Sequence, residues 1–112
     1  MKSIQKSALF KKQLIDFVRD YNQRAGSEVA EKFIDAVERS VEFIQQKPMA
    51  CAIYTESSKH LILQKYEFRK WRIDGFPHSI FFRILNENTI MLEAVYAHRM
   101  NVPYRIQSDM DQ

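Results

Sequence analysis

Hydrophobic residues recur every three or four positions through the first half of the chain, with one interruption at Gly26. This spacing predicts two amphipathic helices. The first begins after Ser7, whose hydroxyl can cap a helix N-terminus, and ends at Gly26, since glycine accepts a positive φ. The second begins at Ser27 and is stopped by Pro48. The short connection predicts an antiparallel helical hairpin, and we expect its apolar stripes to form core.

The second half of the chain has a different pattern, in which β-branched and aromatic runs alternate with glycine, proline and asparagine. Such runs are typical of strands. We predict strands over 68–73, 79–85 and 90–97, and the last two form a central hairpin because both of their faces are largely apolar. Strict alternation places four side chains of the last strand on one face: Ile90, Leu92, Ala94 and Tyr96.

Five other segments have weaker patterns. Residues 1–6 are either a stub of edge strand or disordered. Residues 49–54 form a loop leading into a short strand, 55–60 form a polar turn, and 61–66 form another strand or continue into the next one. Residues 102–112 have no periodicity, so we expect a tail that is loosely held or held only by a partner.

The order of helix, helix and then antiparallel strands predicts an α+β fold. We expect an N-terminal antiparallel helical hairpin packed on a twisted, mainly antiparallel sheet of three to five strands. A chain of 112 residues has the size of one domain, which we place at residues 1–101, with the tail at 102–112.

The net charge, the cysteine count and the lack of long apolar runs indicate which classes of protein fit this sequence. The net charge of +3 permits contact with nucleic acid or an acidic protein but requires neither. The single cysteine, Cys51, excludes an internal disulfide and fits a reducing compartment. The sequence has no apolar run typical of a signal peptide or a membrane span, so we expect a cytoplasmic protein that makes no membrane contact.

The sequence has no pattern for metal-assisted or covalent catalysis. The three histidines, His60, His78 and His98, stand at no ligand spacing with one another or with the cysteine. With only two glycines, the chain has no phosphate-binding glycine loop. We therefore expect neither a metal nor a cofactor.

What remains is a set of cationic and aromatic side chains on the predicted strands. Its cations are Lys65, Arg69, Lys70, Arg72, Arg83 and Arg99. Its aromatic and imidazole groups are Tyr66, Phe68, Trp71, Tyr96 and His98. Because neighbouring strands bring side chains within reach, we expect a single docking surface beneath the paired helices. An RNA phosphate site, a basic protein-binding face and a solvated strand face all fit this composition. Arg83 lies among apolar residues and needs a partner, for which Glu93 is the obvious candidate.

The same residues resemble a known family. The order helix, glycine, helix and Pro48, followed by FRKWRIDGFPHSIFFR and a last strand ending in YAHRMN, is similar to the RelE/ParE toxin superfamily of type II toxin–antitoxin modules. The most diagnostic positions are Arg69, Gly75–Pro77, Ile80–Arg83 and His98–Arg99. The resemblance extends to Asn101 and is closer to the ParE branch. The sequence departs from the pattern in its reduced first strand and its longer tail.

The resemblance implies a toxin that a cognate antitoxin neutralises within a hetero-oligomer. ParE-like members lack a full catalytic set and inhibit DNA gyrase, and we expect the same non-enzymatic activity here. Under this interpretation the target- or partner-binding residues are Lys65, Arg69, Lys70, Trp71, Arg72 and Arg99. RelE-like members instead cut messenger RNA on the ribosome. Under that alternative the catalytic residues are Arg69, Arg83, Tyr96 and His98. A third hypothesis is a scaffold that only binds its partner protein.

Overall fold

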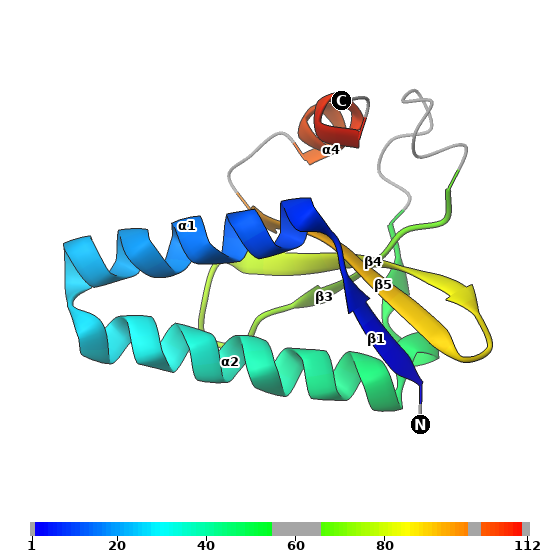
Figure 1. Ribbon diagram of the computed structural model, residues 1–112, viewed down its shortest axis with the longest axis horizontal. Coiled ribbons are helices and arrows are strands. Elements are labelled where there is room, and N and C mark those ends of the chain that lie inside the picture. Colours follow the sequence, from blue (N-terminus) through cyan, green and yellow to red (C-terminus); the bar gives the residue numbers. More distant parts are fainter. Residues whose placement is uncertain (1, 55–65, 99–101, 111–112) are drawn as a thin grey trace.

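The computed structural model describes residues 2–54, 66–98 and 102–110, and it has the predicted α+β fold (Figure 1). Two long helices form the hairpin, α1 (Ala8–Ala25) and α2 (Ser27–Gln46). A short 3-10 helix η1 (Pro48–Ala50) follows, and α4 (Val102–Met110) is the last element. The strands are β1 (Ser3–Lys6), β2 (Ala52–Ile53), β3 (Arg69–Arg72), β4 (His78–Asn86) and β5 (Thr89–Ala97).

The five strands form one sheet in the order β1-β5-β4-β3-β2. The β2–β3, β3–β4 and β4–β5 pairs are antiparallel, and β1 pairs with β5 in parallel. The prediction of a mainly antiparallel sheet is therefore confirmed. The first residues of the chain, left open above, form an edge strand in which Ile4 lies beside Ile90. The predicted turn at 55–60 and all but Tyr66 of the possible strand at 61–66 lie outside the described residues.

Ser7 connects the start of α1 to the sheet. Its side-chain oxygen accepts a hydrogen bond from the Phe10 backbone N–H at 2.9 Å, so it caps the helix as predicted. The same hydroxyl donates to the Glu93 carbonyl at 2.7 Å, and the Ser7 N–H donates to the Leu92 carbonyl at 3.0 Å. At the other end of the helix Gly26 has a φ of +92°, which confirms its predicted role.

Strand β5 contains a β-bulge at Glu93. Phe81 pairs with Ala94 while Phe82 pairs with Leu92, so Glu93 is an extra residue in the ladder. This residue reverses the alternation of side chains that follow it. The prediction that Ile90, Leu92, Ala94 and Tyr96 share one face is therefore wrong: Ile90 and Leu92 face the helical hairpin, whereas Ala94 and Tyr96 lie on the opposite face.

Apolar clusters cover both faces of the sheet. The larger cluster lies under the hairpin and contains Phe10, Phe33, Val37, Ile44, Ile80, Phe82, Ile90, Leu92 and Val95. The smaller one lies on the other face and contains Tyr54, Phe68, Phe81, Ala94, Tyr96 and Ile106. The central strands are thus covered on both sides, as their apolar sequence predicts.

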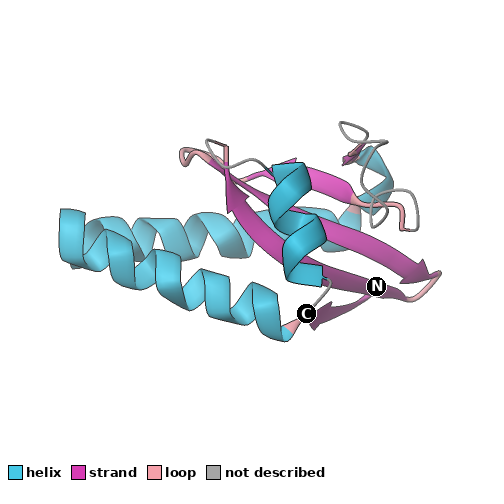
Figure 2. Cartoon of the chain, turned by 90° about the horizontal axis from the view of Figure 1, so that it is seen from above, coloured by secondary structure: helices cyan, strands magenta, loops and turns pink. Residues whose placement is uncertain are grey.

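The C-terminal segment forms a helix, α4, that lies over the second face of the sheet (Figure 2). Ile106 is fully buried there, and the Tyr96 hydroxyl donates a hydrogen bond to the Asp109 carboxylate at 2.6 Å. The expectation of a tail that is loosely held or held only by a partner is wrong for residues 102–110. So short a helix is stabilised by tertiary contacts, which a search for periodicity does not detect. None of the helices in the described ranges is long and apolar enough to cross a lipid bilayer.

His78 opens β4 in an aromatic environment under the hairpin. Its ring centroid lies 4.4 Å from that of Phe17 and 5.4 Å from that of Phe33. Its Nε2 is 2.8 Å from the Tyr21 hydroxyl, and its Nδ1 is buried without a hydrogen-bond partner. Burial, with a smaller contribution from His98, lowers the pKa of His78 to about 4. The imidazole is therefore neutral in the folded protein at neutral pH.

The capping role of Ser7 predicts the effect of a Ser7→Ala substitution. It removes the cap of α1 and the side-chain bond to β5, so the free energy of unfolding should fall by about 1–2 kcal/mol in urea denaturation. Ser27→Ala is the matched control, because the start of α2 has no side-chain cap hydrogen bond. The control should change stability by less than about 0.5 kcal/mol. Equal effects of the two substitutions would contradict the assignment.

The buried His78 predicts a pH dependence of stability. In the unfolded chain this histidine titrates near its ordinary pKa of about 6.5, so between that pH and about 4 the unfolded state binds more protons. Its contribution to stability is complete above about pH 6.5 and is lost on acidification to about pH 4, by at most roughly 3 kcal/mol. A His78→Phe variant should show a shallower loss over this range, measured by urea denaturation. Parallel pH profiles for both proteins would refute the prediction.

Candidate functional site

The predicted site residues of β3 are divided between the two faces of the sheet. Arg69 pairs with Phe82 and Trp71 with Ile80, both in the core under the hairpin. Lys70 and Arg72 alternate with them, and therefore face the other side. The expectation of a single docking surface beneath the paired helices is wrong, because it ignored this alternation.

Arg69 and Trp71 hold neighbouring elements in place. Arg69 is 8% exposed, and its Nη1 donates to the Cys51 carbonyl at 2.8 Å, which ties the segment before β2 to β3. Its Nη2 lies 3.8 Å from the Glu67 carboxylate. The Trp71 ring stacks on Phe43 with a centroid distance of 4.1 Å and packs α2 against the sheet. Both side chains have structural contacts on the hairpin side.

Arg83 and Glu93 form the predicted ion pair on the opposite face. The Glu93 carboxylate is buried, and the bond from Arg83 Nε compensates its charge. The Arg83 guanidinium carbon also lies 4.4 Å from the centroid of the Tyr66 ring. Arg83 is thus held on both sides in the free protein.

Tyr96 is fully buried beneath α4. Its burial and its hydrogen bond to Asp109 raise the pKa of its hydroxyl. The hydroxyl is therefore protonated and donates to the carboxylate. In this conformation it has no access to a substrate.

The sheet brings together four polar side chains on the face away from the hairpin: Lys70, Arg72, Ser79 and His98. We call them the cation cluster. Arg72 pairs with Ser79 across the β3–β4 ladder, and Ser79 Oγ lies 3.0 Å from His98 Nε2. Burial lowers the pKa of His98, and the charges of Arg72 and Lys70 lower it further. Sequence reasoning missed Ser79, whose position depends on strand register. The predicted residues Lys65 and Arg99 lie outside the described residues.

The bonds of His98 define its protonation state. A backbone hydrogen bond to His78 favours a proton on the imidazole, while the nearby cations oppose a second one. In the neutral ring Nε2 then carries no proton and accepts a hydrogen bond from the Ser79 hydroxyl. The cluster therefore presents a lysine and an arginine beside a neutral, exposed imidazole. Within the described ranges, no three His, Cys, Asp or Glu residues lie close enough together to hold a metal ion.

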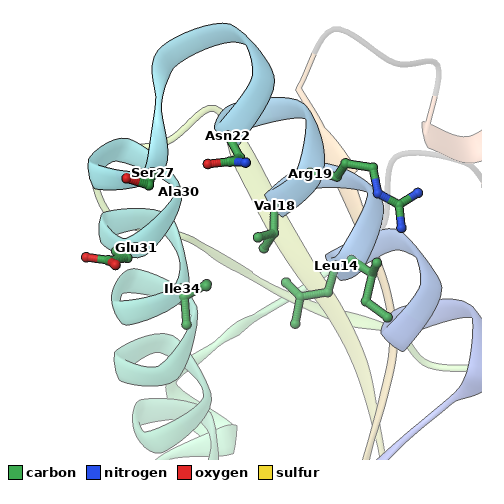
Figure 3. Close-up of a pocket in the computed structure, with 9 residues that line it drawn as sticks. Leu14, Val18, Arg19, Asn22, Ser27, Ala30, Glu31 and Ile34 are labelled. Carbon is green, nitrogen blue, oxygen red and sulfur yellow. The ribbon is translucent and has the colours of Figure 1, made fainter.

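A second candidate surface is a groove between α1 and α2, which we call the interhelical groove (Figure 3). One hollow in it has a volume of about 590 Å³, and its lining includes Leu14, Ile15, Val18, Ala30 and Ile34. A smaller hollow of about 320 Å³ shares Leu14 and Ile34 and adds Phe10, Val37 and Val41. The apolar stripes were expected to form core, but Ile34, a member of the second stripe, is 38% exposed. Ile15, which lies beside the first stripe, is 57% exposed.

Comparisons with known proteins give a consistent result. The family model described as ParE toxin of type II toxin-antitoxin system, parDE, matches residues 4–102. Among solved structures, the chain is similar to one from the chromosomal ParDE TA system from P. aeruginosa, with a TM-score of 0.67 and 18% sequence identity. That match covers 87% of this chain and 96% of the other. The search of curated proteins gave no match.

Proposed function

The chain belongs to the ParE toxin family of type II toxin–antitoxin systems, and from this premise we propose that it inhibits DNA gyrase in the cytoplasm and is neutralised by a cognate antitoxin. The observation that carries the proposal is the family match over residues 4–102 in a chain whose candidate catalytic groups are separated. A gyrase inhibitor acts by binding, so it needs accessible surfaces and no acid–base pair. The interhelical groove and the cation cluster are two such surfaces.

The positions of the candidate catalytic residues weigh against the ribonuclease alternative. That mechanism needs arginines and a proton-transfer group around one phosphate. Arg69 lies on the hairpin side of the sheet, while Arg83 is bonded to Glu93 on the other side. Tyr96 is covered by α4. Of the four residues, His98 alone is exposed, and a single imidazole is not a catalytic set.

The interhelical groove supports the antitoxin half of the proposal. Exposed apolar side chains in a groove between two helices suit the apolar face of a partner helix. The α2 rim carries Glu31, Glu38 and Glu42, whereas Arg19 and Lys6 stand on the other rim. We therefore propose that the antitoxin segment in this groove carries basic residues toward α2. The similar P. aeruginosa structure is of a ParDE TA system, which fits a partner of this kind.

The proposed activity predicts a loss of supercoiling. Purified protein added in excess should abolish gyrase supercoiling of relaxed plasmid, because inhibition requires only binding. Premixing it with the product of the neighbouring reading frame, as the antitoxin, should restore supercoiling. Messenger RNA in a translating extract should stay intact under the same conditions. Unimpaired supercoiling at excess toxin would reject the proposal, and cleaved messages would favour the ribonuclease.

The groove predicts a site-specific loss of antitoxin binding. Ile15→Glu places a charge on its apolar wall, and Ile15 is exposed enough for the fold to tolerate it. We expect antitoxin affinity to fall at least about tenfold, and the rise in melting temperature caused by the antitoxin to shrink accordingly. The matched control is Leu85→Glu, at a residue of β4 that is 41% exposed and lines neither hollow of the groove. Equal losses for both variants would show that the groove is not the contact.

A further inference from the structure

We infer that the cation cluster, formed by Lys70, Arg72, Ser79 and His98, binds a phosphate group of a nucleic-acid backbone. The inference concerns a property of the chain alone and does not depend on gyrase being the target. It starts from the register of the sheet. Lys70 and Arg72 are two residues apart on β3 and so share a face, and the β3–β4 ladder places Arg72 beside Ser79.

The charges at this place are not balanced by described carboxylates. Like charges on one strand face repel each other, so Lys70 and Arg72 together favour an anion between them. Two carboxylates on the same face, Glu93 and Asp109, are already bonded to Arg83 and Tyr96. Among the described residues, neither Lys70 nor Arg72 has a carboxylate within 4.0 Å, the limit for a salt bridge.

The donors of the cluster match a phosphate group. Arg72 offers a planar set of N–H groups and Lys70 a compact ammonium, which together suit a tetrahedral oxyanion. The Ser79 hydroxyl is bonded to His98 in the free protein. When an anion approaches, it stabilises the imidazolium form of His98. Nε2–H then donates to Ser79 Oγ, and the hydroxyl proton is released to point at the anion.

A polyanion fits this surface better than an acidic protein does. The cluster is a set of polar side chains on a sheet face, and the two apolar hollows described above lie on the hairpin and include none of its residues. Isolated exposed ion pairs contribute only about 0–1 kcal/mol, which is too little for a stable protein contact. A nucleic-acid backbone instead gains affinity from released counterions for each phosphate that is neutralised. The same two cations therefore bind a backbone phosphate more effectively than a carboxylate.

The test is direct binding of a short labelled DNA duplex, a single-stranded RNA of the same length and polyglutamate to the full chain. The Lys70→Gln/Arg72→Gln double variant removes both cations. The matched control is Lys12→Gln/Arg24→Gln, which removes two exposed cations of α1 and changes the net charge equally. We expect the cluster variant to lose at least about tenfold in nucleic-acid affinity at low salt, and its slope against log salt to fall by about two.

The outcomes separate the possible ligands. Tighter binding of DNA than RNA, or the reverse, identifies the source of the phosphate, and either supports the inference if the cluster variant alone is impaired. Equal losses in the two variants, or polyglutamate binding as tight as that of both polymers, would overturn it. Gyrase inhibition is measured separately, so a failure of the proposed target leaves this result unaffected.

His98 supplies an independent measurement that does not rely on the variants. Its imidazole signals can be followed by NMR in pH titrations of the wild-type chain. Saturation with the oligonucleotide should raise the pKa of His98, because the bound phosphate opposes the charges of Lys70 and Arg72. His78 is buried under the hairpin and only weakly coupled to His98, so its titration should shift much less than that of His98. An unchanged His98 titration at saturation would place the nucleic acid elsewhere and refute the inference.

Discussion

The β-bulge at Glu93 determines how the two halves of this fold fit together. Strand β1 pairs with β5 only as far as Leu92, and beyond it no strand of the described residues borders this edge of β5. The start of α1 takes over there: Ser7 donates to the Glu93 carbonyl, and the Val95 N–H donates to the Gln13 side chain at 2.8 Å. A helix thus satisfies a strand edge that would otherwise be open to other chains.

The same bulge determines which side chains of β5 lie on each face of the sheet. By reversing the alternation in β5, it turns Tyr96 away from the helical hairpin and into the cluster that α4 covers. The buried hydroxyl then stabilises α4 through Asp109 and is not available to a substrate. Because the interhelical groove lies on the hairpin and the cation cluster on the opposite face, the two surfaces can be occupied independently. A partner confined to the groove would leave Arg72 and His98 accessible.

The parts of the fold that were predictable have local causes. The Ser7 cap, Gly26 and the strands on either side of Gly75 each follow from the properties of a few adjacent residues. The parts that were missed depend on distant contacts. Ile106 is the buried side chain that packs α4 on the sheet. The other buried residues of its cluster come from four other segments of the chain. Likewise nothing in the apolar stripe of α2 distinguishes the exposed Ile34 from a core residue.

The candidate site also contains one contact that could be predicted from the sequence and one that could not. Arg83 lies opposite Met91, and Glu93, two residues further along β5, lies on the same face as Met91 with or without the register shift. The Arg83–Glu93 pair was therefore predictable. The contact between Ser79 and His98 was not. A ladder continued without a bulge from the Phe82–Leu92 pair would set Ser79 opposite Val95, with His98 on the wrong face. A single inserted residue, with no glycine to mark it, therefore creates the cation cluster.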